Sequence, residues 1–200
     1  MTALLWAGAA GALLFNAVFL ADGLTRPGYD PVRQPVSALA LGSRGWLQTT
    51  NFIVCGLLVT AGAGAVPAVF DSLLLAGAVG ALGLALVASG GFAMDPMRGY
   101  PPGTPDRAPE ELSRSHRIHD AAGAVVFTLL PGTALVAAFV LADPAWKWAS
   151  GIVCAAAAVG AGVFGQAWEN DSRYAGLVQR ATILLGLVWL GVLFTHGAVR

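Results

Sequence analysis

Long apolar stretches alternate with short polar segments along the whole chain. Six of these stretches are about 20 residues long, the length that crosses the hydrocarbon core of a bilayer as a helix. They cover Ala3–Ala21, Leu47–Val69, Ser72–Ala93, His119–Ala142, Lys147–Gln166 and Gly176–Ala198. The pattern predicts an all-α polytopic membrane protein, with residues 1–200 folded as a single domain of six transmembrane helices.

The polar segments between the spans are unequal in length. Two links are very short, at Phe70-Asp71 and Asp143–Trp146, whereas the links 22–46, 94–118 and 167–175 are longer and carry most of the charge. Because consecutive spans cross the membrane in opposite directions, the three long links lie on the same side. We call this side the loop-rich face.

Two of the long links contain local structural signals. Residues 28–31, Gly-Tyr-Asp-Pro, are typical of a turn, and Pro35 suits the first turn of a helix that continues to Leu41. We therefore expect a short interfacial or re-entrant helix there. Residues 100–105, Tyr-Pro-Pro-Gly-Thr-Pro, are too rich in turn residues for a helix. The link that contains them is either a lid or a solvated loop.

Composition narrows the class of protein. Hydrophobic residues make up 56% of the chain and charged residues 11%, with 11 basic and 11 acidic residues and a formal net charge of zero. This balance argues against a nucleic-acid-binding protein and a disordered chain. Glycine occurs 26 times, and small residues let transmembrane helices approach closely. We therefore expect a tight bundle rich in small residues.

The distribution of basic residues predicts an orientation. The loop-rich face and its helix edges hold nine arginines, namely Arg26, Arg33, Arg44, Arg98, Arg107, Arg114, Arg117, Arg173 and Arg180. The opposite face holds Lys147 and Arg200. By the positive-inside rule the loop-rich face is cytoplasmic, and we expect the cytoplasmic membrane of a prokaryote. If the arginines bind a ligand, their uneven distribution reflects that binding and does not indicate the orientation of the protein.

The densest polar segment is Ser-Arg-Ser-His-Arg-Ile-His-Asp at residues 113–120. On a helix, His116, His119 and Asp120 share one face. Two imidazoles and a carboxylate placed in this way can transfer protons or bind a divalent metal as a cofactor. The alternative is that they only supply the polar first turn of the fourth span, where an acid suits the helix dipole.

Asp95, directly after the third span, is predicted to join this cluster. If spans three and four are antiparallel neighbours, its carboxylate faces His119 and Asp120. We therefore predict Asp95, His116, His119 and Asp120 as catalytic residues. Ser37 is a nucleophile only if a base lies near it, and His119 is the nearest candidate. Otherwise the Ser37 hydroxyl binds the local backbone.

Further polar residues of the loop-rich face are predicted to contact a substrate. They are Arg33, Ser37, Asn51, Arg98, Arg117, Glu169 and Arg180. Arginine holds phosphate and other anions through its planar fork of donors, and an ionisable residue at membrane depth is a functional candidate by default. For Arg180, an ion pair with Glu169 or Asp171 is the competing interpretation.

Three groups of short motifs carry a family pattern. They are Gln34–Leu39 with Asn51-Phe52 and Gly56–Leu58, then Phe92–Pro96 with His116, His119 and Phe127, and finally Gly176–Arg180 with Trp189. These motifs resemble the bacterial and archaeal membrane family known as domain of unknown function 998. Gln179 stands where an acid is expected before the arginine. The resemblance implies a six-helix membrane fold and no known activity.

Three functions fit these observations. The first is a membrane enzyme acting on a lipid or isoprenoid at the Asp/His/Arg cluster. The second is a non-catalytic protein that binds a lipid or an ion, or a small transporter, although no internal repeat of the kind seen in transporters is evident. The third is a structural membrane protein in which the cluster only satisfies helix ends. Membrane lipid is the expected partner in each case, and nucleic acid is not.

Overall fold

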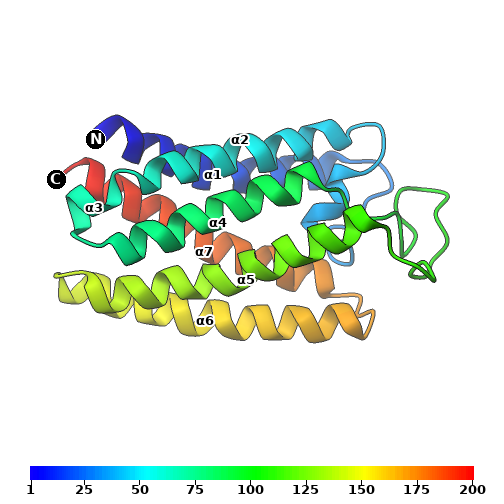
Figure 1. Ribbon diagram of the computed structural model, residues 1–200. Coiled ribbons are helices and arrows are strands. Elements are labelled where there is room, and N and C mark those ends of the chain that lie inside the picture. Colours follow the sequence, from blue (N-terminus) through cyan, green and yellow to red (C-terminus); the bar gives the residue numbers. More distant parts are fainter.

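The computed structural model describes residues 1–200 and is almost entirely helical (Figure 1). Six long helices are long and apolar enough to cross a membrane. They are α1 (Thr2–Thr25), α2 (Gly45–Ala63), α4 (Leu73–Gly91), α5 (Arg114–Val140), α6 (Pro144–Glu169) and α7 (Ala175–Ala198). Two short elements complete the fold, the 3-10 helix η1 (Val36–Ala40) and the helix α3 (Val66–Phe70). The predicted six-span, all-α membrane architecture is confirmed.

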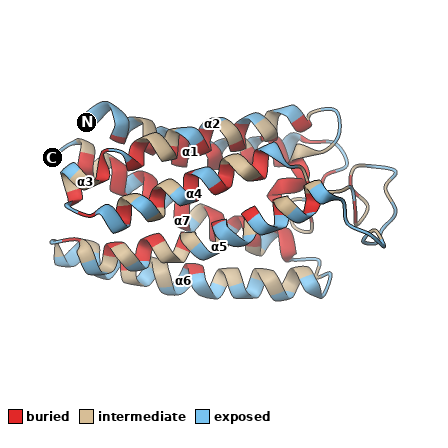
Figure 2. Cartoon of the chain, in the orientation of Figure 1, coloured by how far each residue is buried: buried red, intermediate tan, exposed pale blue.

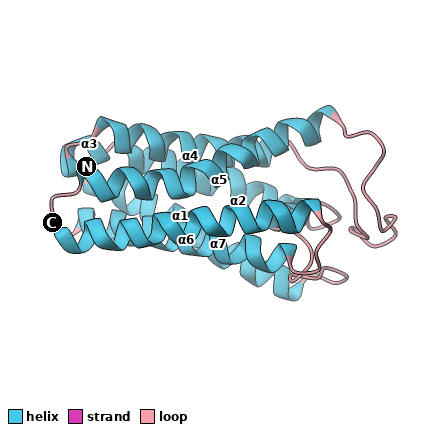
Figure 3. Ribbon diagram, turned by 90° about the horizontal axis from the view of Figure 1, so that it is seen from below, coloured by secondary structure: helices cyan, strands magenta, loops and turns pink.

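The long helices form a closed ring. Each lies beside two others, in the order α1, α2, α4, α5, α6, α7 and back to α1, and α5 also touches α7 across the ring. Both chain ends lie at one end of the bundle and the three long links at the other (Figures 1 and 3). Figure 2 shows that α6 is the most exposed helix, whereas buried residues follow α1 and α7.

Side-chain caps set several helix starts. Ser72 Oγ accepts from Leu75 N–H, Ser113 Oγ accepts from His116 N–H, and the Asp143 carboxylate accepts from Ala145 N–H. The Ser113 cap explains why α5 starts at Arg114, earlier than the predicted His119, because it satisfies an amide of the first turn. The helix α5 continues through Pro131.

The predicted second span is divided. Helix α2 ends at Ala63, and α3 starts after a turn at residues 64–65, with Pro67 in its first turn. Proline suits that position because its missing N–H would have no helical partner there. The expected continuous span Leu47–Val69 is therefore wrong at its end.

Glycine permits a close contact between α2 and α4. A Cβ at Gly56 of α2 would lie 2.6 Å from the Gly83 carbonyl oxygen of α4, and a Cβ at Gly83 would lie 2.7 Å from that of Gly56. The two backbones therefore meet where neither residue carries a side chain, as expected of membrane helices. Not every glycine in the spans lies at a close helix contact, because an added Cβ at Gly77, Gly162 or Gly165 meets nothing within 4 Å.

Candidate functional site

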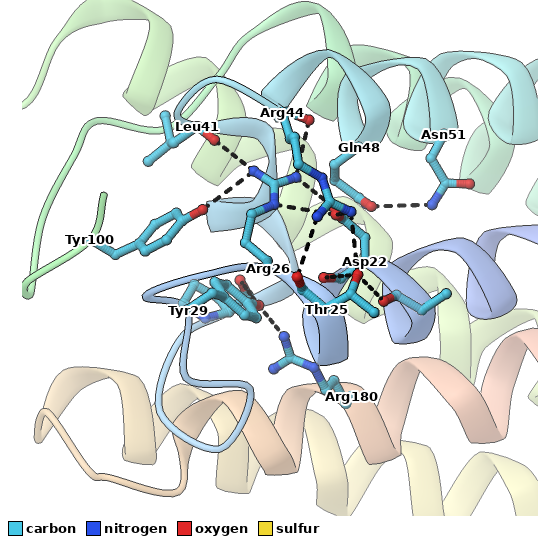
Figure 4. A network of polar contacts seen from close by, with 12 residues as sticks. Asp22, Thr25, Arg26, Tyr29, Leu41, Arg44, Gln48, Asn51, Tyr100 and Arg180 are labelled. Carbon is cyan, nitrogen blue, oxygen red and sulfur yellow. Dashed lines mark hydrogen bonds and ion pairs between the residues drawn. The ribbon is translucent and has the colours of Figure 1, made fainter. Parts of the chain in front are cut away.

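A buried ionic cluster fastens the first long link to the end of α1 (Figure 4). The Asp22 side chain is fully buried and pairs with both Arg26 and Arg44, the latter at 2.6 Å. Arg26 also donates to the carbonyl oxygens of Leu41 and Arg44 at 3.0 Å and to the Tyr100 hydroxyl at 3.3 Å. Burial lowers the pKa of Arg26, but the hydrogen bonds and charges of Asp22 and Tyr100 together raise it more, so the pKa is raised overall. Arg26 is therefore a charged crosslink between residues 26–44 and the second long link.

Arg180 fastens the same link to α7. Its Nη1 donates to the carbonyl oxygens of Pro31 at 2.6 Å, Gln34 at 2.7 Å and Gly176 at 3.0 Å, and its Nη2 donates to the Tyr29 hydroxyl. Burial raises the pKa of Tyr29 despite the nearby guanidinium, so the phenol stays protonated and donates to Gln34 and Pro35 carbonyls. Figure 4 shows Arg180 pointing toward Tyr29.

These contacts correct the prediction for Arg180. It forms no ion pair with Glu169 or Asp171, and its guanidinium is occupied by the protein's own oxygens. A carbonyl oxygen is an acceptor like a substrate phosphate, so sequence alone could not separate the two partners. Arg180 is a positioning residue and not a substrate ligand.

The start of α7 pairs directly with the first link. The N–H groups of Gly176 and Leu177 donate to the carbonyls of residues 33 and 32 at 3.1 and 2.9 Å. Gln179 Oε1 accepts from the Val36 N–H at 2.7 Å. Because a carboxylate would accept this hydrogen bond equally well but carries no donor, glutamine leaves an additional NH₂ group available. The motif Gln34–Leu39 and the motif Gly176–Arg180 are therefore in contact, and this contact holds η1 in place.

The segment expected to form a short interfacial or re-entrant helix is instead the five-residue 3-10 helix η1. Its residues Val36–Leu39 are buried, and it contacts α1, α2 and α7. Pro35 precedes it as the cap residue. The element is therefore embedded in the bundle end, and it carries Ser37 inward.

Asp95 and His116 form one half of the predicted cluster. The Asp95 backbone N–H donates to His116 Nδ1 at 2.9 Å, and Asp95 Oδ2 accepts from the Ser113 N–H at 2.7 Å. His116 Nε2 lies 3.1 Å from Asp120 Oδ2. Burial raises the pKa of Asp95, but the hydrogen bonds from Ser113 together with the nearby His116 and Arg117 hold the pKa below its usual value. The prediction that Asp95 faces His119 is wrong, because Asp95 packs on His116 at the start of α5.

His119 lies about one turn further along α5 and has different partners. Its Nδ1 is 2.8 Å from the Phe92 carbonyl oxygen and 3.1 Å from that of Ser89. Carbonyl oxygens only accept hydrogen bonds, so Nδ1 carries the proton in the neutral ring and Nε2 holds the lone pair. No hydrogen bond within the protein involves His119 Nε2. Its tautomer is fixed, and its basic nitrogen is free.

The two histidines and Asp120 do not form a metal centre. No group of three or more His, Cys, Asp or Glu side chains in the chain is arranged to hold one ion. Both nitrogens of His116 face groups of the protein, and His119 points to the carbonyls at the end of α4. The proposed divalent ion at His116, His119 and Asp120 therefore does not fit.

Two neighbouring spaces lie beside His119. The larger, which we call the groove, holds about 430 Å³ between α5, α6 and α7 and is lined by Ser37, His119, Asp120, Glu169 and Gln179 among others. The second, which we call the inner cavity, is a narrow space of about 40 Å³. Ser37, His119, Gly123, Phe127 and Gln179 line both, so the polar side chains stand where the two spaces meet.

The inner cavity is apolar beyond this junction. Its lining residues on α5 lie between His119 and Leu130, and Phe15, Leu86 and Ile183 line it from α1, α4 and α7. A cavity with these walls accepts hydrocarbon more readily than a polar group.

The remaining predicted arginines are occupied away from the groove. Arg33 pairs with Asp106 at 2.7 Å, which raises the pKa of Arg33 and lowers that of Asp106, and it reaches Asp171 at 3.4 Å. Arg98 lies 3.4 Å from Asp171, and its guanidinium lies over the Trp168 ring at 3.9 Å. Burial lowers the pKa of Arg98. These residues join the links to one another, and none lines the groove.

Three other residues were predicted to contact a substrate, and the structure gives each a different position. Asn51 is buried and donates to the Phe15 carbonyl and to Gln48, so it is structural and does not contact the groove. Arg117 is exposed and donates to Leu112, also outside the groove. Glu169 is exposed at the groove and forms no ion pair.

Sequence reasoning missed Gln179 as a site residue and Asp22, Arg26 and Tyr29 as the residues that position the link. The sequence did mark Gln179, because glutamine stands there where an acid is expected. Its role, however, depends on a hydrogen bond from Val36, which is far from it along the chain. The Asp22–Arg26 pair is at i, i+4 on the chain, a spacing that brings the two side chains together on a helix.

The fold and the site define a six-span integral membrane protein with a groove of about 430 Å³ at one end of its helix bundle. Residues 9–196 match the family described as protein of unknown function DUF998, and the chain belongs to this family. No curated protein and no solved structure matches the chain.

Proposed function

We propose that the protein is a membrane-embedded enzyme that acts on a lipid or isoprenoid-type lipid held in the groove. In this proposal the apolar part of the substrate enters the inner cavity, its polar end stays in the groove, and His119 accepts and returns a proton. Of the predicted Asp/His/Arg cluster, only the residues that line the groove, His119 and Asp120, belong to this site.

The observation that supports this proposal best is the free Nε2 of His119. Imidazole is the most common general base in enzymes, and its efficiency depends on a fixed tautomer and on access to the reacting proton. The Ser89 and Phe92 carbonyls supply the first condition, and the position of His119 at both spaces supplies the second.

The arrangement of the groove favours a lipid as the partner. Hydrophobic residues dominate the inner cavity, whereas the groove carries Asp120 and Glu169. This change from apolar to polar lining parallels the change from chains to head group in a membrane lipid. With the arginine distribution of the chain, the site belongs on the cytoplasmic side of a prokaryotic cytoplasmic membrane.

The experiment is lipid turnover by the purified full chain in nanodiscs made from total polar lipids of a bacterial membrane. Mass spectrometry before and after incubation should show loss of one lipid class and gain of its product with the unaltered protein. His119→Gln should slow this by about 100-fold or more, the usual contribution of a general base. His196→Gln is the matched control, because His196 lies near the other end of α7, stacked on Trp146, and it should retain turnover.

Unchanged lipids with the unaltered protein, together with a lipid that stays bound, would support the non-catalytic binder and overturn the enzyme. The transporter alternative has less structural support, because each of the six long helices runs at least 19 residues without interruption, whereas transporters often bind substrate at broken helices.

A further inference from the structure

We infer that the substrate is an acyl ester of a membrane lipid with an uncharged or cationic head group, and that Ser37 is the nucleophile that receives the acyl group. This inference rests on the proposed function, since it uses His119 as the base. It adds the bond that is broken, the residue that attacks it and the charge of the head group.

Ser37 has an unusually available hydroxyl. A serine near a helix start ordinarily bonds its local backbone, but Ser37 Oγ has no hydrogen-bond partner, although the residue is only 9% exposed. The Pro35 cap, the Val36–Gln179 hydrogen bond and the two arginine crosslinks hold the backbone on both sides of it. The hydroxyl lines the same two spaces as His119. No hydrogen bond joins Ser37 Oγ to His119 Nε2 in the structure, so the proposed activation requires the two side chains at this junction to come within hydrogen-bond reach when substrate binds.

Gln179 supplies a hydrogen-bond donor at the same junction. Its Oε1 is occupied by the Val36 N–H, so its amide NH₂ has a defined direction and no partner in the protein. The residue is 6% exposed and lines both spaces. An amide donor held in advance stabilises the oxyanion that forms when an ester carbonyl is attacked.

The order of the spaces matches an acyl ester. In such a lipid the ester carbonyl lies between the acyl chain and the head group, just as Ser37, His119 and Gln179 lie between the inner cavity and the groove. The part of the chain next to the carbonyl then lies in the apolar slot, whose volume of about 40 Å³ is the space of about three waters.

The charges in the groove select the head group. Asp120 and Glu169 line it, and no lysine or arginine does. The arginines predicted to hold phosphate are occupied by Asp106, Asp171 and backbone carbonyls. A head group with net negative charge would meet two carboxylates without a compensating cation, so a neutral or cationic one is favoured.

The reaction step is a transfer between two oxygens. Ser37 Oγ forms a bond to the ester carbonyl carbon while its proton passes to His119 Nε2. The bond from that carbon to the alcohol oxygen breaks, and His119 returns the proton to the departing alcohol. Water then releases the acyl group from Ser37 as a fatty acid by the same sequence, with His119 taking the proton of the water.

The first test uses a long-chain alkyl fluorophosphonate on the full chain in detergent, followed by intact-mass measurement and peptide mapping. Attack by Ser37 forms a P–O bond and expels fluoride, so one adduct per chain should map to Ser37 in the unaltered protein. Ser37→Ala should give no adduct. His119→Gln should react at least about 100-fold more slowly. Ser115→Ala, whose hydroxyl donates to the Ala93 carbonyl outside the groove, should react normally.

No adduct with the unaltered protein, or an adduct that maps to another residue, overturns the inference whatever the variants do. Mapping on the unaltered chain also removes any dependence on whether Ser37→Ala folds. If lipid turnover is lost in His119→Gln but persists in Ser37→Ala, the nucleophile is wrong and the proposed function stands. If the unaltered protein changes no lipid, both the nucleophile and the proposed function fail.

The head-group selection has a separate test. Vesicles containing diacylglycerol, which is neutral, should be hydrolysed at least 10-fold faster than vesicles containing phosphatidylglycerol, which is anionic. Glu169→Gln should narrow this ratio, because it removes one of the two carboxylates that line the groove. Equal rates for the two lipids would overturn the selection.

Discussion

The contact between Gly176 and the first link offers a quantitative test of how the site is held. A Cβ at this position would lie 2.3 Å from the Gln34 carbonyl oxygen and 2.8 Å from Arg180 Nη1. Ordinary contact begins near 3.4 Å, so Gly176→Ala must move the link away by about 1 Å. That displacement lengthens the hydrogen bonds from Gly176 and Leu177 to the link, now 3.1 and 2.9 Å.

The energetic cost follows from these contacts. Each weakened hydrogen bond is worth about 1 kcal/mol, and overpacking costs about 1–3 kcal/mol. We therefore expect Gly176→Ala to lower the free energy of unfolding by about 3–5 kcal/mol, which for a chain of this size lowers the melting temperature by about 6–20 °C.

The assay is thermal unfolding in detergent, followed by the fluorescence of the six tryptophans. Gly162→Ala is the control, because an added Cβ there meets nothing within 4 Å and alanine favours a helix by up to about 1 kcal/mol over glycine. A melting temperature of Gly176→Ala equal to that of Gly162→Ala would refute the close docking of the link on α7.

Three further predictions follow from the buried groups and the groove. Asp22→Asn should destabilise the protein by about 3–5 kcal/mol in the same melting assay, because it leaves buried Arg26 without its counter-charge; a loss below about 1 kcal/mol would contradict this. Asp95 has a lowered pKa, so its carboxylate stabilises the fold above its usual pKa of 3.8, and this contribution disappears as the pH falls through the folded value. Asp95→Asn should therefore flatten the loss of stability below about pH 4, and parallel pH profiles would argue against the Ser113 contact. Gly123→Leu should fill the junction of groove and inner cavity, since an added Cβ has open space, and abolish lipid turnover at nearly unchanged melting temperature; normal turnover would place the chemistry elsewhere.

Much of the architecture could be predicted from the chain because it depends on local periodicity. Span length and the spacing of polar links predict six helices with three long links at one end, and the structure has this arrangement. The end of the second span could not be predicted well, because apolar residues continue past Ala63 while the turn at residues 64–65 interrupts the helix.

The site depends on contacts between distant parts of the chain. Spacing on a helix placed His116 and His119 on one face, but one turn of depth separates their surroundings. His116 lies level with the link and meets Asp95, whereas His119 lies level with the last carbonyls of α4. Only the packing of α4 against α5 decides which histidine meets which group.

The arginines illustrate a different limit. Sequence identifies guanidinium groups at a membrane face, but an anionic substrate, a carboxylate and a backbone carbonyl all accept the same hydrogen bonds. In the structure, Arg180 binds carbonyls, Arg33 binds Asp106, and neither reaches the groove. Gln179 shows the reverse case, because its free amide becomes evident only once Val36 occupies its oxygen.

The central claim is that the groove takes in one kind of lipid from the membrane. Photo-crosslinking tests it directly, with a benzophenone amino acid placed at Ala124, an exposed residue on the groove, or at Leu135, an exposed residue farther along α5. After irradiation in native membranes, mass spectrometry of the adducts should show one dominant lipid class at position 124 and the bulk lipid mixture at position 135. The same mixture at both positions would contradict a specific lipid site in the groove.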